Sequence, residues 1–308
     1  MKDSAASSVL VHLGAGVGNI VLATPLLIAL HEIGFAVDVL LAADYPETAE
    51  LLRPWSVVRA VFPHGHAFDP SSYERVAPAI PPFYARRYGG ALARLPHAVP
   101  RPPDTLFYEN EQQFYLHFAY ALGWTGGGPP LPALPVGASG LYDSTPDTVV
   151  IAPGCKTSEM AAKRWPYFAE LSAAFEDVAV IGTSDDLRRA DGSALDFPAH
   201  VRSYAGRLSL RQTAEFIAGA GVVIGNDSGL THIAAAVGTP TVMIFGPTPD
   251  VSLAPFSPNV RILRSGLPCE PCWFRDRFGA CASRIDCLKG IDIQSAIREI
   301  SSLRGCLQ

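Results

Sequence analysis

The chain lacks an excess of basic residues, and its net negative charge argues against a nucleic-acid partner. Its 308 residues include 24 Lys and Arg against 29 Asp and Glu, which gives a net charge of −5. Nucleic-acid-binding proteins carry a basic footprint that neutralises phosphate groups. We therefore expect no nucleic-acid partner.

Long apolar runs are also absent from the sequence. No segment reaches the roughly 18 consecutive apolar residues that a transmembrane helix needs. The N-terminal MKDSAASSVLVHLGAGVGN has no basic region followed by an uninterrupted apolar core, as an export signal would have. These absences predict a cytoplasmic protein without a transmembrane segment.

Cysteine is sparse, with six residues in the whole chain, which is too few for the disulfide framework of a small secreted protein. Four of them nevertheless gather in one segment, at Cys269, Cys272, Cys281 and Cys287. Four thiolates can surround one zinc or iron ion tetrahedrally. The spacing predicts a structural metal site at 269–287, with reduced buried thiols or disulfides as the alternatives.

The sequence does contain enough apolar residues, 48% of the total, for two globular domains. Short apolar runs typical of buried strands alternate with helical segments on both sides of a Pro/Gly-rich linker near 126–146. Residues 63–104 show no clean periodicity and receive no assignment. Strands are expected at 9–13, 35–42, 57–62, 149–152, 178–181, 222–224 and 241–245, and helices at 20–33, 111–122, 167–175, 210–219, 230–237 and 291–303.

This order predicts an α/β protein of two Rossmann-like domains, residues 1–135 and 136–308. The segment that is most informative about function is GNDSGLTHIAAAVGTPTVMIFGPTPD, residues 225–250. In it a strand ends at a polar turn, and Asp227 or Ser228 can cap the helix that follows. Gly229 lets a ligand approach the backbone where free N–H groups favour an anion. The turn therefore predicts a phosphate site at the carboxyl edge of a sheet.

This segment resembles the nucleotide-sugar half of glycosyltransferase family 9, the heptosyltransferases, whose signature reads D-[ST]-G-x-x-H-x-A-A-x-x-G-x-P and then F-G-x-T. Two further segments follow the order of that family. They are APG at 152–154 with KRWP at 163–166, and GAGVGN at 14–19 with TP at 24–25. The resemblance implies the GT-B architecture, in which two Rossmann-like domains face one another across a cleft.

The resemblance also implies roles for single residues. Lys163 is expected to neutralise the departing diphosphate, and Asp227, Ser228, Gly229 and His232 to bind the nucleotide sugar. A four-cysteine element like the one at 269–287 occurs in autotransporter heptosyltransferases, where it resembles an iron-binding finger.

For two of the candidate binding residues, an ordinary structural role remains an alternative. Asp185 follows a strand and can contact a ribose or cap a helix. His232 can donate to a phosphate or be an ordinary helix histidine.

The glycine loop of the first domain poses a problem of acid–base chemistry. Gly16 and Gly18 are expected to border the substrate, and the family carries in this loop an Asp proposed to deprotonate the acceptor. Here that position is Asn19, and an amide cannot act as a general base at neutral pH. Either Asn19 only orients the acceptor, or another group takes the proton, with Glu109, Glu111 and His12 as candidates and ordinary acids at a helix start as the alternative for the two glutamates. Asn19→Asp is expected to retain or increase activity, because it restores the carboxylate that the family carries in this loop.

The function expected from these features is transfer of a sugar, heptose in the first place, from a nucleoside-diphosphate sugar to an acceptor hydroxyl. ADP-heptose is the expected donor, and the acceptor is a glycan, a glycolipid of the lipopolysaccharide type or a protein. No catalytic cofactor is expected, and the protein can lie at the periphery of the inner membrane. The alternatives are a catalytically silent binding protein and a sugar-nucleotide epimerase, and the oligomeric state is left open.

Overall fold

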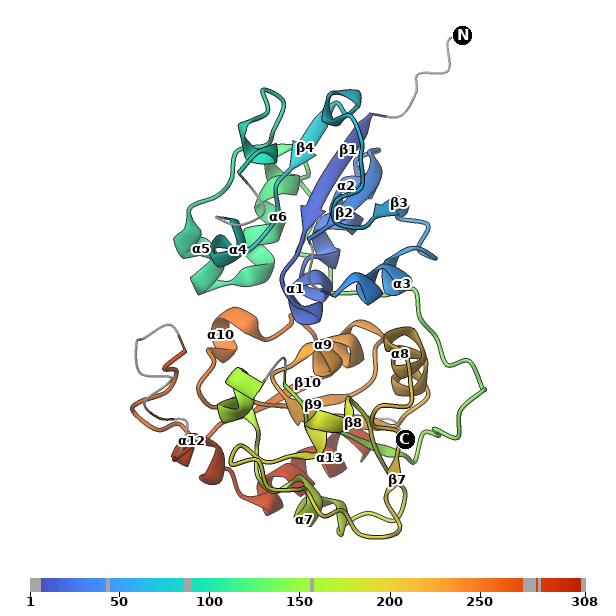
Figure 1. Cartoon of the computed structure of the whole chain (residues 1–308), viewed down its shortest axis with the longest axis vertical. Coiled ribbons are helices and arrows are strands. Elements are labelled where there is room, and N and C mark those ends of the chain that lie inside the picture. Colours follow the sequence, from blue (N-terminus) through green and yellow to red (C-terminus); the bar gives the residue numbers. More distant parts are fainter. Residues whose placement is uncertain are drawn as a thin grey trace. The chain divides into compact units, whose positions relative to one another are not determined.

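A computed structural model of the chain describes residues 7–42, 45–85, 90–155, 158–273, 281 and 284–305. The chain divides into two compact units, Met1–Pro135 and Val136–Gln308 (Figure 1). Each unit is an α/β layer structure built on one parallel sheet, as the sequence predicted. Within the described ranges, no helix combines the length and the apolar character needed to cross a bilayer.

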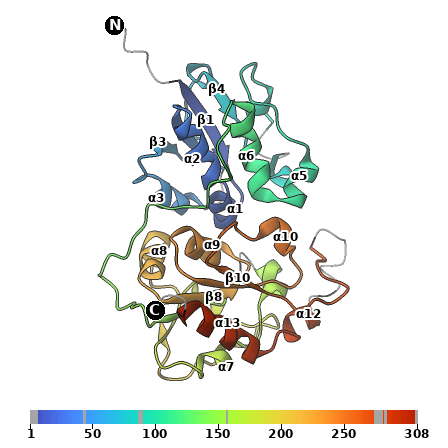
Figure 2. The same cartoon turned by 180° about the vertical axis from the view of Figure 1, so that it is seen from behind.

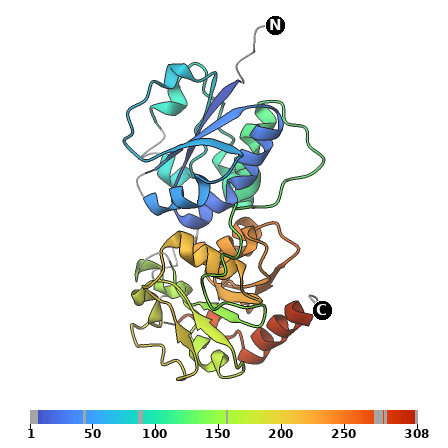
Figure 3. The same cartoon turned by 90° about the vertical axis from the view of Figure 1, so that its right-hand side faces the viewer.

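The first unit contains a four-stranded parallel sheet in the order β3-β2-β1-β4. In Figure 3 the blue helix α2 and the green helix α6 lie side by side against it. Its elements are β1 Ser8–Leu13, α1 Val17–Leu22, α2 Thr24–Glu32, β2 Ala36–Leu41, η1 Pro46–Thr48, α3 Ala49–Leu52, β3 Val58–Phe62, η2 Pro70–Ser72, β4 Arg75–Ala77, α4 Pro82–Tyr84, η4 Leu92–Arg94, α5 Asp104–Glu109 and α6 Glu111–Ala121.

Two features of this unit differ from the sequence prediction. The single helix expected over 20–33 is two helices, because Ala23 ends α1 and Pro25 stands in the first turn of α2. Proline lacks an N–H and fits only the first turn of a helix, so a new helix begins there. The unassigned stretch 63–104 contributes β4, which pairs with β1 at the edge of the sheet.

The second unit contains a six-stranded parallel sheet in the order β10-β9-β8-β5-β6-β7. Helices α8 and α9 cover one face, and α13 packs across β8, β9 and β10 on the other (Figure 2). Its elements are β5 Val149–Ala152, η5 Ser158–Lys163, α7 Phe168–Ser172, β6 Val178–Val180, η6 Ser184–Leu187, β7 Arg202–Ser203, α8 Leu210–Ala218, β8 Val222–Asn226, α9 Gly229–Ala236, β9 Thr241–Ile244, α10 Asp250–Leu253, β10 Val260–Leu263, α12 Asp286–Lys289 and α13 Ile293–Gly305.

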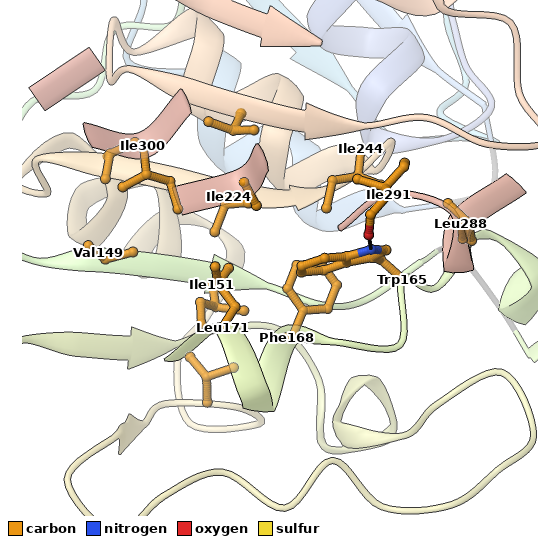
Figure 4. Packing of buried hydrophobic residues seen from close by; sticks show 14 of the residues in the cluster. Val149, Ile151, Trp165, Phe168, Leu171, Ile224, Ile244, Leu288, Ile291 and Ile300 are labelled. Atoms are coloured by element: carbon orange, nitrogen blue, oxygen red, sulfur yellow. Dashed lines mark hydrogen bonds between the residues drawn. The ribbon is translucent and has the colours of Figure 1, made fainter. Parts of the chain in front are cut away.

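The core of the second unit fixes the loop that carries Lys163. Trp165 is fully buried in the core cluster, where its ring meets Phe168 edge to face and lies near Ile244 and Ile291 (Figure 4). Its indole Nε1 donates to the carbonyl oxygen of Ile291 at 3.1 Å. Burial of an indole of this size, with its polar atom satisfied, anchors the chain on both sides of it. The buried Trp165 therefore fixes the backbone position of Lys163, two residues earlier in the chain.

Candidate functional site

The loops that follow β5 and β8 are joined by one buried amide. Asn226, the last residue of β8, is fully buried. Its Oδ1 accepts from the backbone N–H of Trp165 at 2.9 Å, and its Nδ2 donates to the carbonyl oxygen of Pro153 at 2.7 Å. Because β5 and β8 are neighbours in the sheet, this side chain holds both loops at the carboxyl edge, where ligands of open α/β sheets bind.

A charged cluster stands at this edge. The Lys163 Nζ lies 2.7 Å from the Asp227 Oδ2, and the His232 Nε2 lies 3.3 Å from the Asp227 Oδ1. All three side chains are largely buried, with Lys163 the most exposed at 13%. Burial pushes the pKa of Asp227 upward, but attraction to Lys163 and the contact with His232 outweigh it and hold the pKa well below its usual range. Asp227 is therefore a fixed negative charge that positions a lysine ammonium.

The first turn of α9 completes the cluster. Ser228 is the N-cap residue, and its backbone N–H donates to the Thr231 Oγ1 at 3.3 Å. Ser228 and Gly229 are half-buried, so this end of the helix reaches solvent. The start of a helix carries N–H groups without helical partners and a partial positive charge. Together with Lys163, it forms a place where an anion is stabilised. Of the two caps that the sequence allowed, Ser228 holds the position, and Asp227 pairs with Lys163.

The two aspartates after β6 have different environments. Asp185 is exposed. Asp186 is buried, and its Oδ2 accepts from the backbone N–H and the hydroxyl of Thr183, at 2.8 and 2.9 Å. Its Oδ1 lies 3.6 Å from the Arg164 Nη2. A Cβ atom on Gly154 would stand 2.2 Å from its carboxyl carbon, so the glycine leaves room for this carboxylate. Asp186 is thus a structural anchor, and Asp185 remains the candidate for a ribose contact.

In the first unit, the glycine loop and the start of α6 form a second polar cluster. Gly16 is the N-cap of α1 and donates its backbone N–H to the Asn19 Oδ1 at 2.8 Å. The Asn19 Nδ2 donates to the Glu111 Oε1 at 2.6 Å, and the Tyr115 hydroxyl donates to the same oxygen at 2.8 Å. The structure therefore brings together two of the predicted catalytic residues, Asn19 and Glu111. Gly18 lies half-buried in the same turn.

The other two candidates for the base lie apart from this contact. Glu109 ends α5 and is exposed. His12 lies on β1, is 2% exposed, and neither ring nitrogen has a hydrogen-bond partner among the described residues. Burial, with a smaller contribution from His64, lowers the pKa of His12 to about 4. The imidazole is therefore neutral at physiological pH and part of the sheet core.

Comparison with known proteins shows a family resemblance in the second unit. The family model of glycosyltransferase family 9 (heptosyltransferase) matches residues 139–279. That range includes the Lys163–Asp227–His232 cluster. The match lies within the C-terminal unit, which is similar to glycosyltransferase family 9 over this range. A curated relative, lipooligosaccharide heptosyltransferase 2 of Haemophilus influenzae, is 34% identical over 113 residues, which are 33% of each chain. The matched region thus spans about a third of the curated relatives it resembles.

Solved structures extend the likeness to both units. The ADP-heptose lipopolysaccharide heptosyltransferase II of Escherichia coli aligns with a TM-score of 0.74 and 22% identity, over 96% of this chain and 98% of that one. TibC, an iron-containing dodecameric heptosyltransferase solved with ADP-D-β-D-heptose, aligns with a TM-score of 0.65 and 18% identity, over 97% of this chain and 77% of that one. At these identities the likeness shows the fold, an α/β structure with the two parallel sheets of GT-B heptosyltransferases.

The cysteine segment at 269–287 is described only in part. Cys272 and Cys287 are buried, Cys281 is half-buried and Cys269 is exposed. Among the residues that the structure describes, no three His, Cys, Asp or Glu side chains come together closely enough to hold a metal ion. Burial, and then Glu270 and the thiols of Cys281 and Cys272, raise the pKa of Cys287 to about 12.

Sequence reasoning missed two residues that organise the clusters. Asn226 stands directly before the Asp-Ser-Gly turn, where it read as part of a polar loop. Tyr115 lies one helical turn after Glu111, a spacing that places both side chains on one face of α6. That spacing could have identified Tyr115. Nothing local could have identified Asn226, because its partners precede it by 61 and 73 residues.

Proposed function

We propose that this protein is a heptosyltransferase that moves heptose from ADP-heptose to a hydroxyl group of an acceptor. One observation carries the proposal. The Lys163 ammonium is fixed 2.7 Å from the Asp227 carboxylate, beside the first turn of α9. A positive charge next to a helix N-terminus suits a diphosphate. Two facts support heptose as the sugar and ADP as the nucleotide. The relatives are heptosyltransferases, and TibC was solved with ADP-heptose.

The geometry suits departure of a nucleoside diphosphate. In sugar transfer, negative charge grows on the leaving phosphate oxygen as its bond to the sugar breaks. Fixed positive groups that meet this charge lower the barrier, since they need no reorganisation during the reaction. Lys163 and the N–H groups at the start of α9 fill this role. Asp227 and His232 hold the lysine in place, and Asp185 accepts from ribose hydroxyls.

The proposal is tested by incubating the purified protein with ADP-heptose and a lipopolysaccharide-core acceptor while ADP release is followed. We expect ADP to form only when the acceptor is present. Lys163→Ala should weaken ADP binding by about tenfold or more, because a charge-assisted contact is lost. Lys289→Ala, which removes an exposed lysine on α12, is the matched control and should bind ADP normally. Calorimetry measures both affinities.

Three outcomes would contradict the proposal. Equal ADP affinity in the wild type and in Lys163→Ala would remove the site. ADP binding without turnover on any acceptor would indicate a catalytically silent protein. Conversion of the nucleotide sugar with no acceptor present would indicate an epimerase.

The acceptor and the place of action extend the same proposal. The curated relatives are named as lipopolysaccharide or lipooligosaccharide enzymes. We therefore place the protein at the cytoplasmic periphery of the inner membrane, acting on a growing glycolipid, with a glycan or a protein as the other acceptor classes. Sedimentation with vesicles that contain a lipopolysaccharide-core lipid tests this placement, with lipid-only vesicles as the control.

We also propose that Cys269, Cys272, Cys281 and Cys287 hold one structural zinc or iron ion. The support is their spacing, the closeness of the Cys272 and Cys281 thiols to Cys287, and the iron content that is stated for TibC.

A further inference from the structure

A buried carboxylate stands beside the glycine loop of the first unit. Glu111 begins α6 and is fully buried. Its Oε1 accepts two hydrogen bonds, from the Asn19 Nδ2 at 2.6 Å and from the Tyr115 hydroxyl at 2.8 Å. The loop follows β1, and carboxyl ends of parallel strands are where open α/β sheets bind ligands. A proton acceptor is therefore present at this edge, although position 19 itself holds an amide.

The amide at position 19 suits the carboxylate at position 111. The Asn19 Oδ1 is fixed by the backbone N–H of Gly16 at 2.8 Å, so the Nδ2 must point elsewhere, and it meets the Glu111 Oε1. An aspartate at position 19 would place two carboxylates within hydrogen-bond distance, and such a pair cannot ionise fully. The two positions together accommodate one carboxyl group, and in this chain it stands at position 111.

We propose that Glu111 is the general base of the transfer reaction and that Asn19 is the residue that positions it. This inference rests on the proposed function. In the step, the acceptor O–H bond breaks and its proton passes to the Glu111 Oε1. The acceptor oxygen bonds to the anomeric carbon of the sugar, and the bond from that carbon to the diphosphate breaks. The electron pair of that bond leaves on the phosphate oxygen of ADP.

The exposure of the three side chains indicates how an acceptor reaches the base. Asn19 is half-buried, whereas Glu111 and Tyr115 are buried. Of these three, Asn19 is the one that meets solvent, so the route to the carboxylate passes it. An acceptor hydroxyl that enters beside Asn19 and donates to the Glu111 carboxyl is in position for proton transfer.

The decisive experiment exchanges the two functional groups. Glu111→Gln keeps a carbonyl oxygen for both donors and removes the base, so kcat should fall by about 100-fold or more with an unchanged KM for ADP-heptose. Asn19→Asp should also lose activity, contrary to the expectation from the sequence, because the two carboxylates would share a proton. The double variant Asn19→Asp/Glu111→Gln restores one carboxylate and one amide, and should regain most of the loss. Glu50→Gln, an exposed acid on α3, is the control.

The pH profile of the reaction gives a second readout. Tyr115 is buried, and burial, followed by the nearby Glu111, raises its pKa well above the usual value, so it stays a donor. The charged group Arg101 also lies near Tyr115. Tyr115→Phe removes one hydrogen bond from the carboxylate. The acid limb of the kcat profile should then move upward by about one to two pH units, the size expected for a hydrogen bond to a charged group.

The failures of the two ideas are distinguishable. A wild-type protein that transfers no heptose overturns the proposed function, and this inference with it. A wild-type protein that transfers heptose while Glu111→Gln keeps its kcat and its acid limb overturns the inference alone. If Glu109→Gln loses turnover in that case, the base lies at the end of α5. A folding defect in Glu111→Gln would show as a lowered unfolding midpoint, and Tyr115→Phe then decides through the pH profile.

Discussion

At the scale of single residues, Asp227 shows how burial and pairing oppose one another. Burial alone would raise the pKa of this carboxyl, but Lys163 and His232 lower it well below its ordinary value. A carboxyl whose pKa is depressed by folding contributes stability above its unfolded pKa of about 3.9. That contribution is lost as the pH falls below this value toward the folded pKa. The charge needed to position Lys163 is therefore present throughout the neutral range.

Replacement of Asp227 tests this balance without any substrate. Asp227→Asn leaves the Lys163 ammonium without its partner in a largely buried place, and loss of one partner of a buried pair typically costs about 3–5 kcal/mol. Urea unfolding at pH 7 should show a clear loss of stability. The further loss between pH 4 and pH 3 should become smaller than in the wild type, since one depressed carboxyl is gone. Asp196→Asn, at an exposed position, should change neither quantity.

At the scale of elements, the central strands and the longer helices could be predicted, but the other strands and the connections could not. Apolar runs such as Val149–Ala152 identified the buried strands because both faces of a parallel sheet are covered. β4, β7 and β10 were missed because each contains an arginine in place of a continuous apolar run.

The carboxyl edge of the second sheet was predicted through Lys163 and Asp227, since both follow strands. The contact between Asn19 and Glu111 was not, because 92 residues separate them and only tertiary packing brings α1 and α6 together.

The amide that joins the ends of β5 and β8 provides a test at this scale. Asn226→Asp keeps the shape but replaces the donor Nδ2 by an oxygen that faces the carbonyl groups of Pro153 and Gly154. A buried charge without a donor is strongly unfavourable. We expect a loss of about 2 kcal/mol or more in unfolding free energy, with weaker ADP binding because the loop that carries Lys163 is released. Asn259→Asp, on an exposed turn, is the control. A stable Asn226→Asp protein with normal ADP affinity would show that contacts other than the Asn226 amide hold the two loops.

At the scale of the whole molecule, the two units divide the chemistry. The first holds the carboxylate and amide of Glu111 and Asn19, and the second holds the cluster that we propose binds the diphosphate. Each unit has its own sheet. A variant of Glu111 should therefore leave ADP affinity intact, and a variant of Lys163 should leave the hydrogen bonds of Glu111 intact. Cys287, at the end of the cysteine segment, is buried beside the turn at Gly246 of the second unit.

A metal ion in this segment would change the stability of the molecule rather than its chemistry. Four thiolates fill a tetrahedral shell and leave no position for substrate, so metal binding acts through folding. Binding requires Cys269 to leave solvent and the Cys287 thiol, whose pKa burial raises to about 12, to exchange its proton for the ion. We expect protein purified without added metal to contain close to one zinc or iron per chain by elemental analysis. Cys287→Ser should reduce this content and lower the unfolding midpoint, while Cys155→Ser, outside the segment, should keep the metal. If no metal is found and all four thiols react with a thiol reagent in the native protein, these cysteines are not metal ligands.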